Sequence, residues 1–408
     1  MDIRHLLKRP LIGHAGSLGG AALIMAICGV TTNVIWARFV PQDTYGGFKV
    51  IFAIVNMVGT VCLLGTGQAT LMSAAQNADG NLLRLIRAKL IANVGGGLLL
   101  LAAAGYYVCC SVAAKSIASG LVAAAILFPI YNITDLWTSW LNGKGRFREL
   151  ATGRTLIYIF PMSSVSAVAF FSVSELWKVV LVYFTLTSIQ NIVMLRRVMT
   201  LRTNSTNDEG ILALGRHATF AMLLGGVVSL DVLILNHFFS AKDVAIYSVS
   251  LVLPDLIRGG LAIINQLFAP KVNAGQQLTV FWLNYKKTFL VLTIGLVVIG
   301  LVGFFLLPVV VPLLFSEKYI ASAHYSKWLW LVMASVGSFG VLGNALIATR
   351  KVVFTYGAFV GYPILLAIFF FVFAGEGVAG VVMARILAIV GLHLFYAAGF
   401  YIVIKEAP

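Results

Sequence analysis

Charged residues are scarce in this chain of 408 residues, where they make up 11% of the sequence. A soluble protein carries about 25% charged residues, so this chain lacks the side chains that would cover a water-exposed surface of its size. The mean hydropathy of +0.97 excludes a disordered chain and a nucleic-acid-binding protein, despite the formal net charge of +15. The shortage of charge calls for lipid as the solvent. At about 20 apolar residues per helix, the length allows about a dozen membrane spans.

Catalytic and metal-binding motifs are also missing. The sequence contains no Walker motif, HExxH or DxD, so ATP hydrolysis and metal-dependent glycosyl transfer are unsupported. The four cysteines have no metal-ligand spacing and are expected to act as small apolar residues. The longest predicted outer loop, residues 316–324, is too short for a membrane polysaccharide polymerase. We therefore expect no enzyme activity and no cofactor.

Long hydrophobic segments dominate what is present. Twelve are predicted, and all should be helices, because an unpaired backbone amide in hydrocarbon costs several kcal/mol. They span residues 14–37, 45–73, 88–111, 117–142, 151–173, 176–196, 214–239, 244–269, 286–315, 325–349, 352–374 and 377–404.

Basic residues predict the orientation of these spans. With the N-terminus in the cytoplasm, 20 of the 29 Lys and Arg residues fall in inside segments, 6 fall outside and 3 lie within spans. The positive charge is therefore mostly a topology signal, and it predicts a multi-pass inner-membrane protein with both termini cytoplasmic. The tryptophans lie near the predicted span ends, as in an interfacial aromatic belt; they are Trp36, Trp137, Trp140, Trp177, Trp282, Trp328 and Trp330.

One long polar connection, residues 200–210, divides the spans six and six, which predicts two six-helix halves, 1–205 and 206–408. Because six is even, both halves start on the same side, so any repeat is parallel, with its axis along the membrane normal. Residues 38–48 and 237–247 match weakly at one constant offset.

Short motifs carry a family resemblance. Residues 37–46, Ala-Arg-Phe-Val-Pro-Gln-Asp-Thr-Tyr-Gly, resemble the turn after the first helix of polysaccharide transporters of the MOP exporter superfamily. Residues 64–68, 240–249 and 268–271 are similar to further parts of that pattern. Ala245 stands where the family usually has Gly, and many members carry fourteen helices where this chain fits twelve.

The resemblance implies two six-helix bundles that form a V around a central cavity. It implies a flippase that carries polyprenyl-pyrophosphate-linked oligosaccharide repeat units to the outer leaflet, for O-antigen, capsule or exopolysaccharide synthesis. A carboxylate inside a span could bind H+ or Na+ and couple transport to the ion gradient. Membrane lipids, a polysaccharide polymerase and a chain-length regulator are further expected partners, and nucleic acid is not expected.

Ionisable residues inside spans are the candidate site, because each costs roughly 2.5–3.5 kcal/mol there unless it faces a cavity or a partner. Asp255 and Arg258, three residues apart, share one helix face and form either a structural ion pair or a cavity site. Asp231 and Arg385 lie at similar depth, ~12 Å below the outer ends of their spans, so we expect them to approach one another. This pair is either structural or an ion-coupling site.

Three further candidates keep both structural and functional interpretations. Asp135 is expected to pair with Arg154 or another inner-end cation, or to bind the coupling ion. His393 is either a hydrogen-bonded core residue or a proton relay. Lys49 either reaches the outer interface or faces the cavity.

Charge matching favours the flippase hypothesis, since Arg258, Arg385 and Lys49 could offset a pyrophosphate. The alternative is a cation-coupled, MATE-like extruder of drugs or other small solutes, which predicts a carboxylate-dominated cavity. An enzyme and a non-transporting scaffold are the remaining hypotheses, but a scaffold gives no reason for charges inside spans.

Overall fold

The computed structural model describes residues 9–63, 65–110, 115–171, 175–208, 210–272, 278–348 and 352–405. These residues are almost entirely helical and include no strand, which confirms the expected all-α class. The chain divides into two compact units, Met1–Gly226 and Val227–Pro408.

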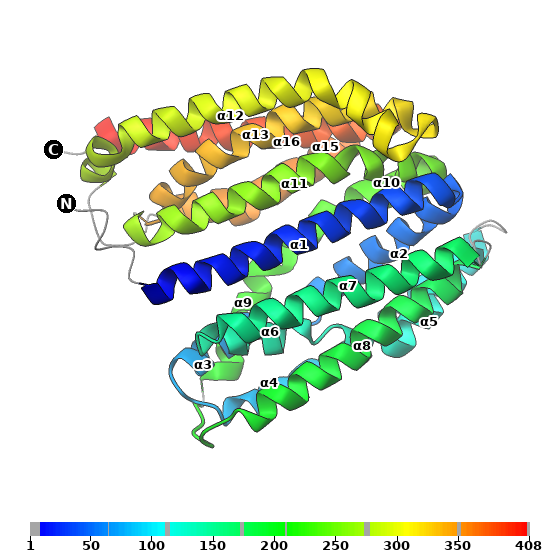
Figure 1. Cartoon of the computed structure of the whole chain (residues 1–408), viewed down its shortest axis with the longest axis horizontal. Coiled ribbons are helices and arrows are strands. Elements are labelled where there is room, and N and C mark those ends of the chain that lie inside the picture. The colour runs from blue at the N-terminus through cyan, green and yellow to red at the C-terminus, as the bar shows by residue number, and fades with distance from the viewer. Residues whose placement is uncertain are drawn as a thin grey trace. The chain divides into compact units, whose positions relative to one another are not determined.

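Long helices form the body of each unit (Figure 1). The first unit contains α1 (Arg9–Phe39), α2 (Gln42–Val61), α3 (Thr66–Ala75), α4 (Asn81–Cys110), α5 (Lys115–Tyr131), α6 (Thr134–Gly143), α7 (Phe147–Phe171), α8 (Leu176–Thr200) and α9 (Ile211–Met222). The 3-10 segment η2 (Leu223–Ser229) contains the boundary between the units. The second contains α10 (Leu230–Phe238), α11 (Ala241–Val272), α12 (Leu278–Phe315), η3 (Glu317–Tyr319), α13 (Ile320–Ala348), α14 (Val352–Tyr356), the π-helical turn η4 (Gly357–Gly361), α15 (Tyr362–Val372), η5 (Ala374–Glu376) and α16 (Gly377–Lys405).

Ten helical stretches in the described residues are long and apolar enough to cross a membrane, and Gly357–Val372 is a shorter apolar helix. The chain is therefore an integral membrane protein. Each segment predicted from hydropathy coincides with one helix or with consecutive helices, although the count of twelve spans and the parallel repeat remain predictions. Several predicted segments are wrong in one respect, because they are not single helices. The segment over 45–73 is broken between α2 and α3, that over 117–142 between α5 and α6, and that over 214–239 is interrupted by a 3-10 segment, η2.

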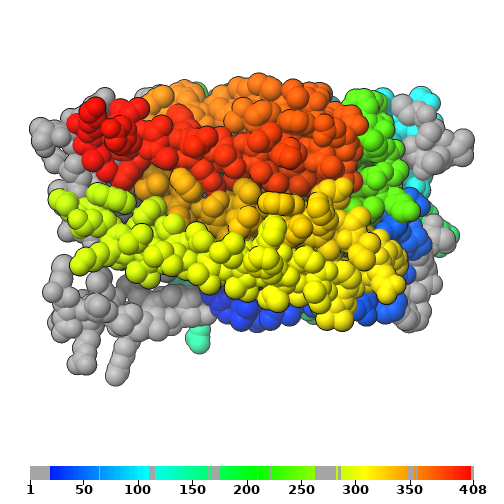
Figure 2. Space-filling view, turned by 90° about the horizontal axis from the view of Figure 1, so that it is seen from above, coloured from blue at the N-terminus to red at the C-terminus, as the bar shows by residue number. Residues whose placement is uncertain are grey.

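Helix α12 shows how lipid replaces water as the solvent. Phe305, Val309 and Leu313 are each about 70% exposed at the surface of the second unit. Figure 2 shows the yellow side chains of α12 running along one face of the molecule. A soluble protein would bury such residues, whereas hydrocarbon solvates them at no cost.

Each unit has a packed core of its own. In the first, α3, α4, α6 and α8 contribute to a cluster centred on the buried rings of Trp137 and Trp140. In the second, α13, α14 and α16 meet around Phe354, Tyr396 and Phe400.

The long polar connection after α8 is docked on the first unit. Both the backbone N–H and the hydroxyl of Thr203 donate to Asp79 Oδ2, at 2.9 and 3.0 Å. The Asp208 N–H donates to Asn81 Oδ1 at 3.0 Å, and Lys144 Nζ lies 2.7 Å from Asp79 Oδ1. Burial raises the pKa of Asp79, but the hydrogen bonds from Lys144 and Thr203 outweigh it and hold that pKa below its ordinary value.

Candidate functional site

A helix break separates α2 from α3. Leu63 adopts φ 53°, a left-handed conformation that a bulky residue rarely takes, and the helix resumes at Thr66. The turn takes the Leu63 carbonyl oxygen out of the regular helical ladder. It accepts hydrogen bonds from Thr66 Oγ1 at 2.7 Å and from Lys89 Nζ at 3.2 Å.

Lys89 on α4 is completely buried, and its second partner is Asp135 on α6. The ammonium nitrogen lies 3.2 Å from Asp135 Oδ2, and Thr66 Oγ1 lies 3.4 Å from the same oxygen. A buried ammonium without an anion would cost several kcal/mol, so this pairing is what allows Lys89 to lie there. Of the partners expected for Asp135, the structure selects another inner-end cation over Arg154.

A second polar cluster closes the break between α5 and α6. Asn191 on α8 donates to the Tyr131 carbonyl at 2.8 Å and accepts from Trp137 Nε1 at 2.9 Å and Thr134 Oγ1 at 3.0 Å. Asn93 on α4 donates to the carbonyl of Pro129 at 3.0 Å. These side-chain amides bind backbone carbonyls that the helices leave unpaired at the break. Unpaired carbonyls would be costly in hydrocarbon, so the two asparagines stabilise the break.

In the second unit, Arg385 on α16 and Asp231 at the start of α10 form an ion pair between Nη2 and Oδ2. Tyr247 on α11 donates its hydroxyl to the same Asp231 oxygen at 2.5 Å. Arg385 Nη2 also donates to the Val228 carbonyl at 3.3 Å, in the 3-10 segment that precedes α10. Asp231 and Arg385 therefore approach one another as their matched depths predict.

The ion pairs Lys89–Asp135 and Arg385–Asp231 share one arrangement. In each, a cation from a long helix binds both a carboxylate and a carbonyl oxygen that an irregular helical segment exposes: Lys89 with Leu63, and Arg385 with Val228. Both cations are at least nine-tenths buried. Each cation thus holds an irregular segment against a regular helix through a hydrogen bond to its backbone. The carboxylate of the pair neutralises the charge of the cation.

Arg258 on α11 differs from these buried cations. Its Nη2 lies 3.2 Å from Asp255 Oδ1 one turn earlier, so the predicted pair on one helix face is formed. The Arg258 side chain is 50% exposed and that of Asp255 is 39% exposed. About half of the Arg258 side-chain surface is therefore left uncovered by the protein, and the guanidinium has more N–H donors than Asp255 alone can accept from.

Lys49 and His393 have protein contacts. Lys49 Nζ on α2 donates to Asn33 Oδ1 on α1 at 3.0 Å and lies 5.2 Å from the centre of the Tyr45 ring. His393 on α16 is 8% exposed, stacks on Phe339 at 4.2 Å between ring centres, and has its Nδ1 3.3 Å from Ser335 Oγ. His393 thus has the surroundings of a hydrogen-bonded core residue.

Three tryptophans correct the aromatic-belt interpretation. Trp36, Trp137 and Trp140 are at most 2% exposed, so they are packed inside the first unit instead of facing the lipid headgroups. Trp177 and Trp328 are about 40% exposed, as a belt requires. The difference arises because a ring near a helix end can pack against a neighbouring helix, as Trp36 does on Phe48.

Sequence reasoning missed Lys89 and Asn191. Lys89 lies at the inner end of the segment predicted over 88–111, which groups it with the inside cations, yet it is the ninth residue of α4 and so ~12 Å from the start of that helix. Asn191 stands near the middle of α8, where its polarity among apolar neighbours was the available signal. Within the described residues, no group of three or more His, Cys, Asp or Glu could hold a metal ion.

Comparison with solved structures gives the fold. The lipid II flippase MurJ in an inward closed conformation superposes with a TM-score of 0.71 at 14% identity, covering 96% of this chain and 88% of that chain. An inward-facing MATE-family multidrug resistance transporter of the MOP superfamily matches with a TM-score of 0.60 at 13% identity, covering 94% and 96%. This chain has the fold of MOP-superfamily transporters.

A third match is a MOP-superfamily transporter from Pyrococcus furiosus whose binding pocket has reversed polarity; it has a TM-score of 0.58 at 13% identity and covers 95% of this chain and 96% of that one. No protein-family model matches the chain, and no curated protein matches it. At these identities the likeness concerns the fold, so the substrate has to be argued from the residues of this chain.

Proposed function

We propose that the chain is a flippase, a secondary transporter that moves polyprenyl-pyrophosphate-linked oligosaccharide repeat units across the bacterial inner membrane by alternating access. Its product would supply O-antigen, capsule or exopolysaccharide synthesis, with a polysaccharide polymerase and a chain-length regulator acting next. The proposal rests on the motif resemblance at residues 37–46, on the shared fold, and on the cation described next.

The half-exposed guanidinium of Arg258 is the observation that carries the proposal. Pyrophosphate concentrates negative charge, and hydrocarbon does not solvate it. Arginine offers paired donors that suit phosphate oxygens, and its charge persists at every physiological pH. Arg258 is therefore our primary substrate contact, and Asp255, one turn away, sets the strength of its field.

The remaining cations take different roles. Arg385 is buried against Asp231, so it supports the second unit and does not contact the pyrophosphate in this state. Lys49 is partly buried beside Asn33 and is proposed as a weaker contact. A negative-inside potential favours outward movement of the anion by ~2.3 kcal/mol per charge per 100 mV.

Asp231 is the proposed coupling site. Its Oδ2 is shared by Arg385 and Tyr247. Binding of H+ or Na+ at this carboxylate would neutralise it and weaken its hold on Arg385, which also bonds the Val228 carbonyl. Ion binding would therefore loosen the segment before α10. Asp135, held by Lys89, and the more exposed Asp255 are alternative coupling sites, while a proton-relay role for His393 is least favoured by its contacts.

A complementation experiment tests the function. The gene is deleted in its host, and surface glycan and internal lipid-linked oligosaccharide are measured with wild type, Arg258→Gln, Arg258→Lys and Lys242→Gln. Deletion should remove the glycan and accumulate the lipid-linked units inside the cell. Arg258→Gln should lower surface glycan at least tenfold at unchanged protein level. Arg258→Lys should keep part of the wild-type surface glycan, because it keeps the positive charge. Lys242→Gln, at an exposed position, should give the wild-type amount.

The MATE-like extruder is the second candidate, favoured by the carboxylates Asp231 and Asp255 and by the shared fold. It predicts normal surface glycan in the deletion strain and increased sensitivity to cationic drugs. That result would remove the flippase proposal, whereas lost glycan with unchanged drug sensitivity would remove the extruder.

A further inference from the structure

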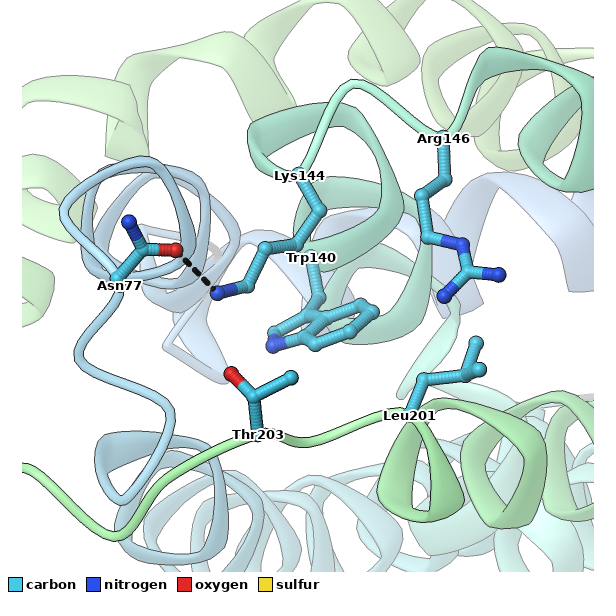
Figure 3. A pocket seen from close by; sticks show the side chains of 6 residues that line it. All are labelled: Asn77, Trp140, Lys144, Arg146, Leu201 and Thr203. Carbon is cyan, nitrogen blue, oxygen red and sulfur yellow. Dashed lines mark hydrogen bonds between the residues drawn. The ribbon is translucent and has the colours of Figure 1, made fainter.

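A pocket of about 330 Å³ lies where α6 ends, on the side of the membrane that the sequence predicts to be cytoplasmic. It is lined by Asn77, Trp140, Lys144, Arg146, Leu201 and Thr203. Figure 3 shows these residues, which come from the α3–α4 loop, the end of α6, the turn after it and the connection that follows α8. None of them belongs to the transport site proposed above.

The turn between α6 and α7 brings two cations to this pocket. Gly145 has φ 66°, a left-handed conformation that glycine adopts without strain, and the Arg146 N–H bonds back to the Leu141 carbonyl at 2.8 Å. This tight reversal places the side chains of Lys144 and Arg146 along one wall of the pocket.

Trp140 supplies a donor that the protein leaves unsatisfied. The residue is 2% exposed, and among the described residues no acceptor lies within hydrogen-bond distance of its Nε1. In Figure 3 the indole nitrogen lies on the edge of the ring that is turned toward Thr203. An indole N–H can only donate, and a buried donor is costly to leave unpaired. The nitrogen is itself covered by neighbouring atoms, so an acceptor in the pocket would reach it after a small movement of the side chains that cover it.

The charges around the pocket have a positive excess. Lys144 pairs with Asp79 at 2.7 Å, and Arg146 pairs with Glu149 at 2.5 Å. A further cation adjoins the second pair, since Arg197 Nε lies 3.6 Å from Glu149 Oε2. Three cations thus lie against two carboxylates, which favours an anionic ligand.

We propose that this pocket binds the phosphate group of an anionic phospholipid from the adjacent leaflet. Trp140 Nε1 donates to one phosphate oxygen, and the spare donors of Lys144 and Arg146 hold the others. The pocket lies at the end of the span Lys115–Gly143, at the depth of the headgroups, and Leu201 provides an apolar contact for the glycerol region. A soluble phosphate ester offers the same chemistry, so the test has to separate the two sources.

The test is native mass spectrometry of the purified full chain with phosphatidylglycerol, phosphatidylcholine or soluble glycerol phosphate. Wild type should retain phosphatidylglycerol in preference to phosphatidylcholine. Trp140→Phe removes the N–H and keeps a ring, and Arg146→Gln removes a surface charge. Each should weaken phosphatidylglycerol binding by about tenfold, the scale of one charge-assisted hydrogen bond. The matched control is Arg84→Gln, an exposed arginine that does not line the pocket.

Equal phosphatidylglycerol retention by wild type, Trp140→Phe and Arg146→Gln would overturn the proposal. So would a wild-type protein that retains neither phosphatidylglycerol nor glycerol phosphate. Arg146→Gln keeps the test decisive if Trp140→Phe fails to fold. Binding of glycerol phosphate without retention of the lipid would overturn the lipid assignment. Because lipid retention is measured without transport, this result is independent of the complementation experiment.

Discussion

The guanidinium of Arg385 on α16 is paired with the carboxylate of Asp231, which lies 154 residues earlier in the chain at the start of α10. Tyr247 and the Val228 carbonyl complete the cluster, so three helical segments of the second unit meet at one charge pair. The pair is buried, and neither charge can be solvated if the other is removed.

Replacing Arg385 with Met should therefore lower the free energy of unfolding by about 3–5 kcal/mol, because it leaves an uncompensated carboxylate in a low-dielectric interior. The double variant Arg385→Met, Asp231→Leu should recover most of the loss. Denaturant unfolding in detergent micelles measures both. Arg258→Met, at a half-exposed position, should change stability far less. A double variant no better than the single one would show that the two charges are not coupled.

Lys89 offers a second test, in the first unit. Lys89→Met leaves Asp135, whose side chain is 24% exposed, without its cation and removes one donor to the Leu63 carbonyl, so we expect a loss of about 1–3 kcal/mol. Adding Asp135→Asn should restore part of that loss. Arg87→Met is the matched control, since Arg87 is exposed two residues earlier on α4. Thermal unfolding, monitored by circular dichroism, distinguishes these variants. Equal destabilisation by Lys89→Met and Arg87→Met would contradict a stabilising role for the Lys89–Asp135 pair.

The docked connection predicts a pH dependence. Burial raises the pKa of Asp79, but the hydrogen bonds from Lys144 and Thr203 bring it below its ordinary value. A carboxylate whose pKa is lowered on folding contributes stability that is fully present above its unfolded pKa, about 3.9, and is lost as pH falls through the folded pKa.

Unfolding free energy measured from pH 6 down to pH 2.5 should therefore decline in wild type below about pH 4. Asp79→Asn should be less stable at pH 6 and should show a weaker decline. Glu376→Gln, at an exposed position in the second unit, should keep the wild-type profile. An Asp79→Asn profile parallel to wild type would show that this carboxylate contributes nothing on folding.

Hydropathy alone located the helices, because a membrane imposes one length and one polarity on every span. It did not locate the break at Leu63, although Gly65 and Gly67 follow directly, because glycines are frequent in membrane helices and here did not lower the hydropathy enough to divide the segment. Thr66, three residues later, and Lys89, 26 residues later, both donate to the carbonyl that the turn exposes, and hydropathy registers neither contact.

Depth along a span predicted the approach of Asp231 and Arg385, because two opposite charges in hydrocarbon have few other partners. Depth could not reveal that Arg385 is buried while Arg258 is half exposed. That distinction depends on which helices pack against each face, and it moves the proposed substrate contact to Arg258. The substrate-binding and ion-coupling roles themselves remain predictions.

The docking of residues 203–208 against the α3–α4 loop has a practical consequence for dividing the gene. A fragment that stops at residue 202 would lack both Thr203 donors to Asp79 and the Asp208 donor to Asn81. If the two halves are co-expressed as separate chains, the N-terminal chain should therefore include all of residues 203–208. The long polar connection is the obvious place to divide the gene, but a division within it would remove these contacts.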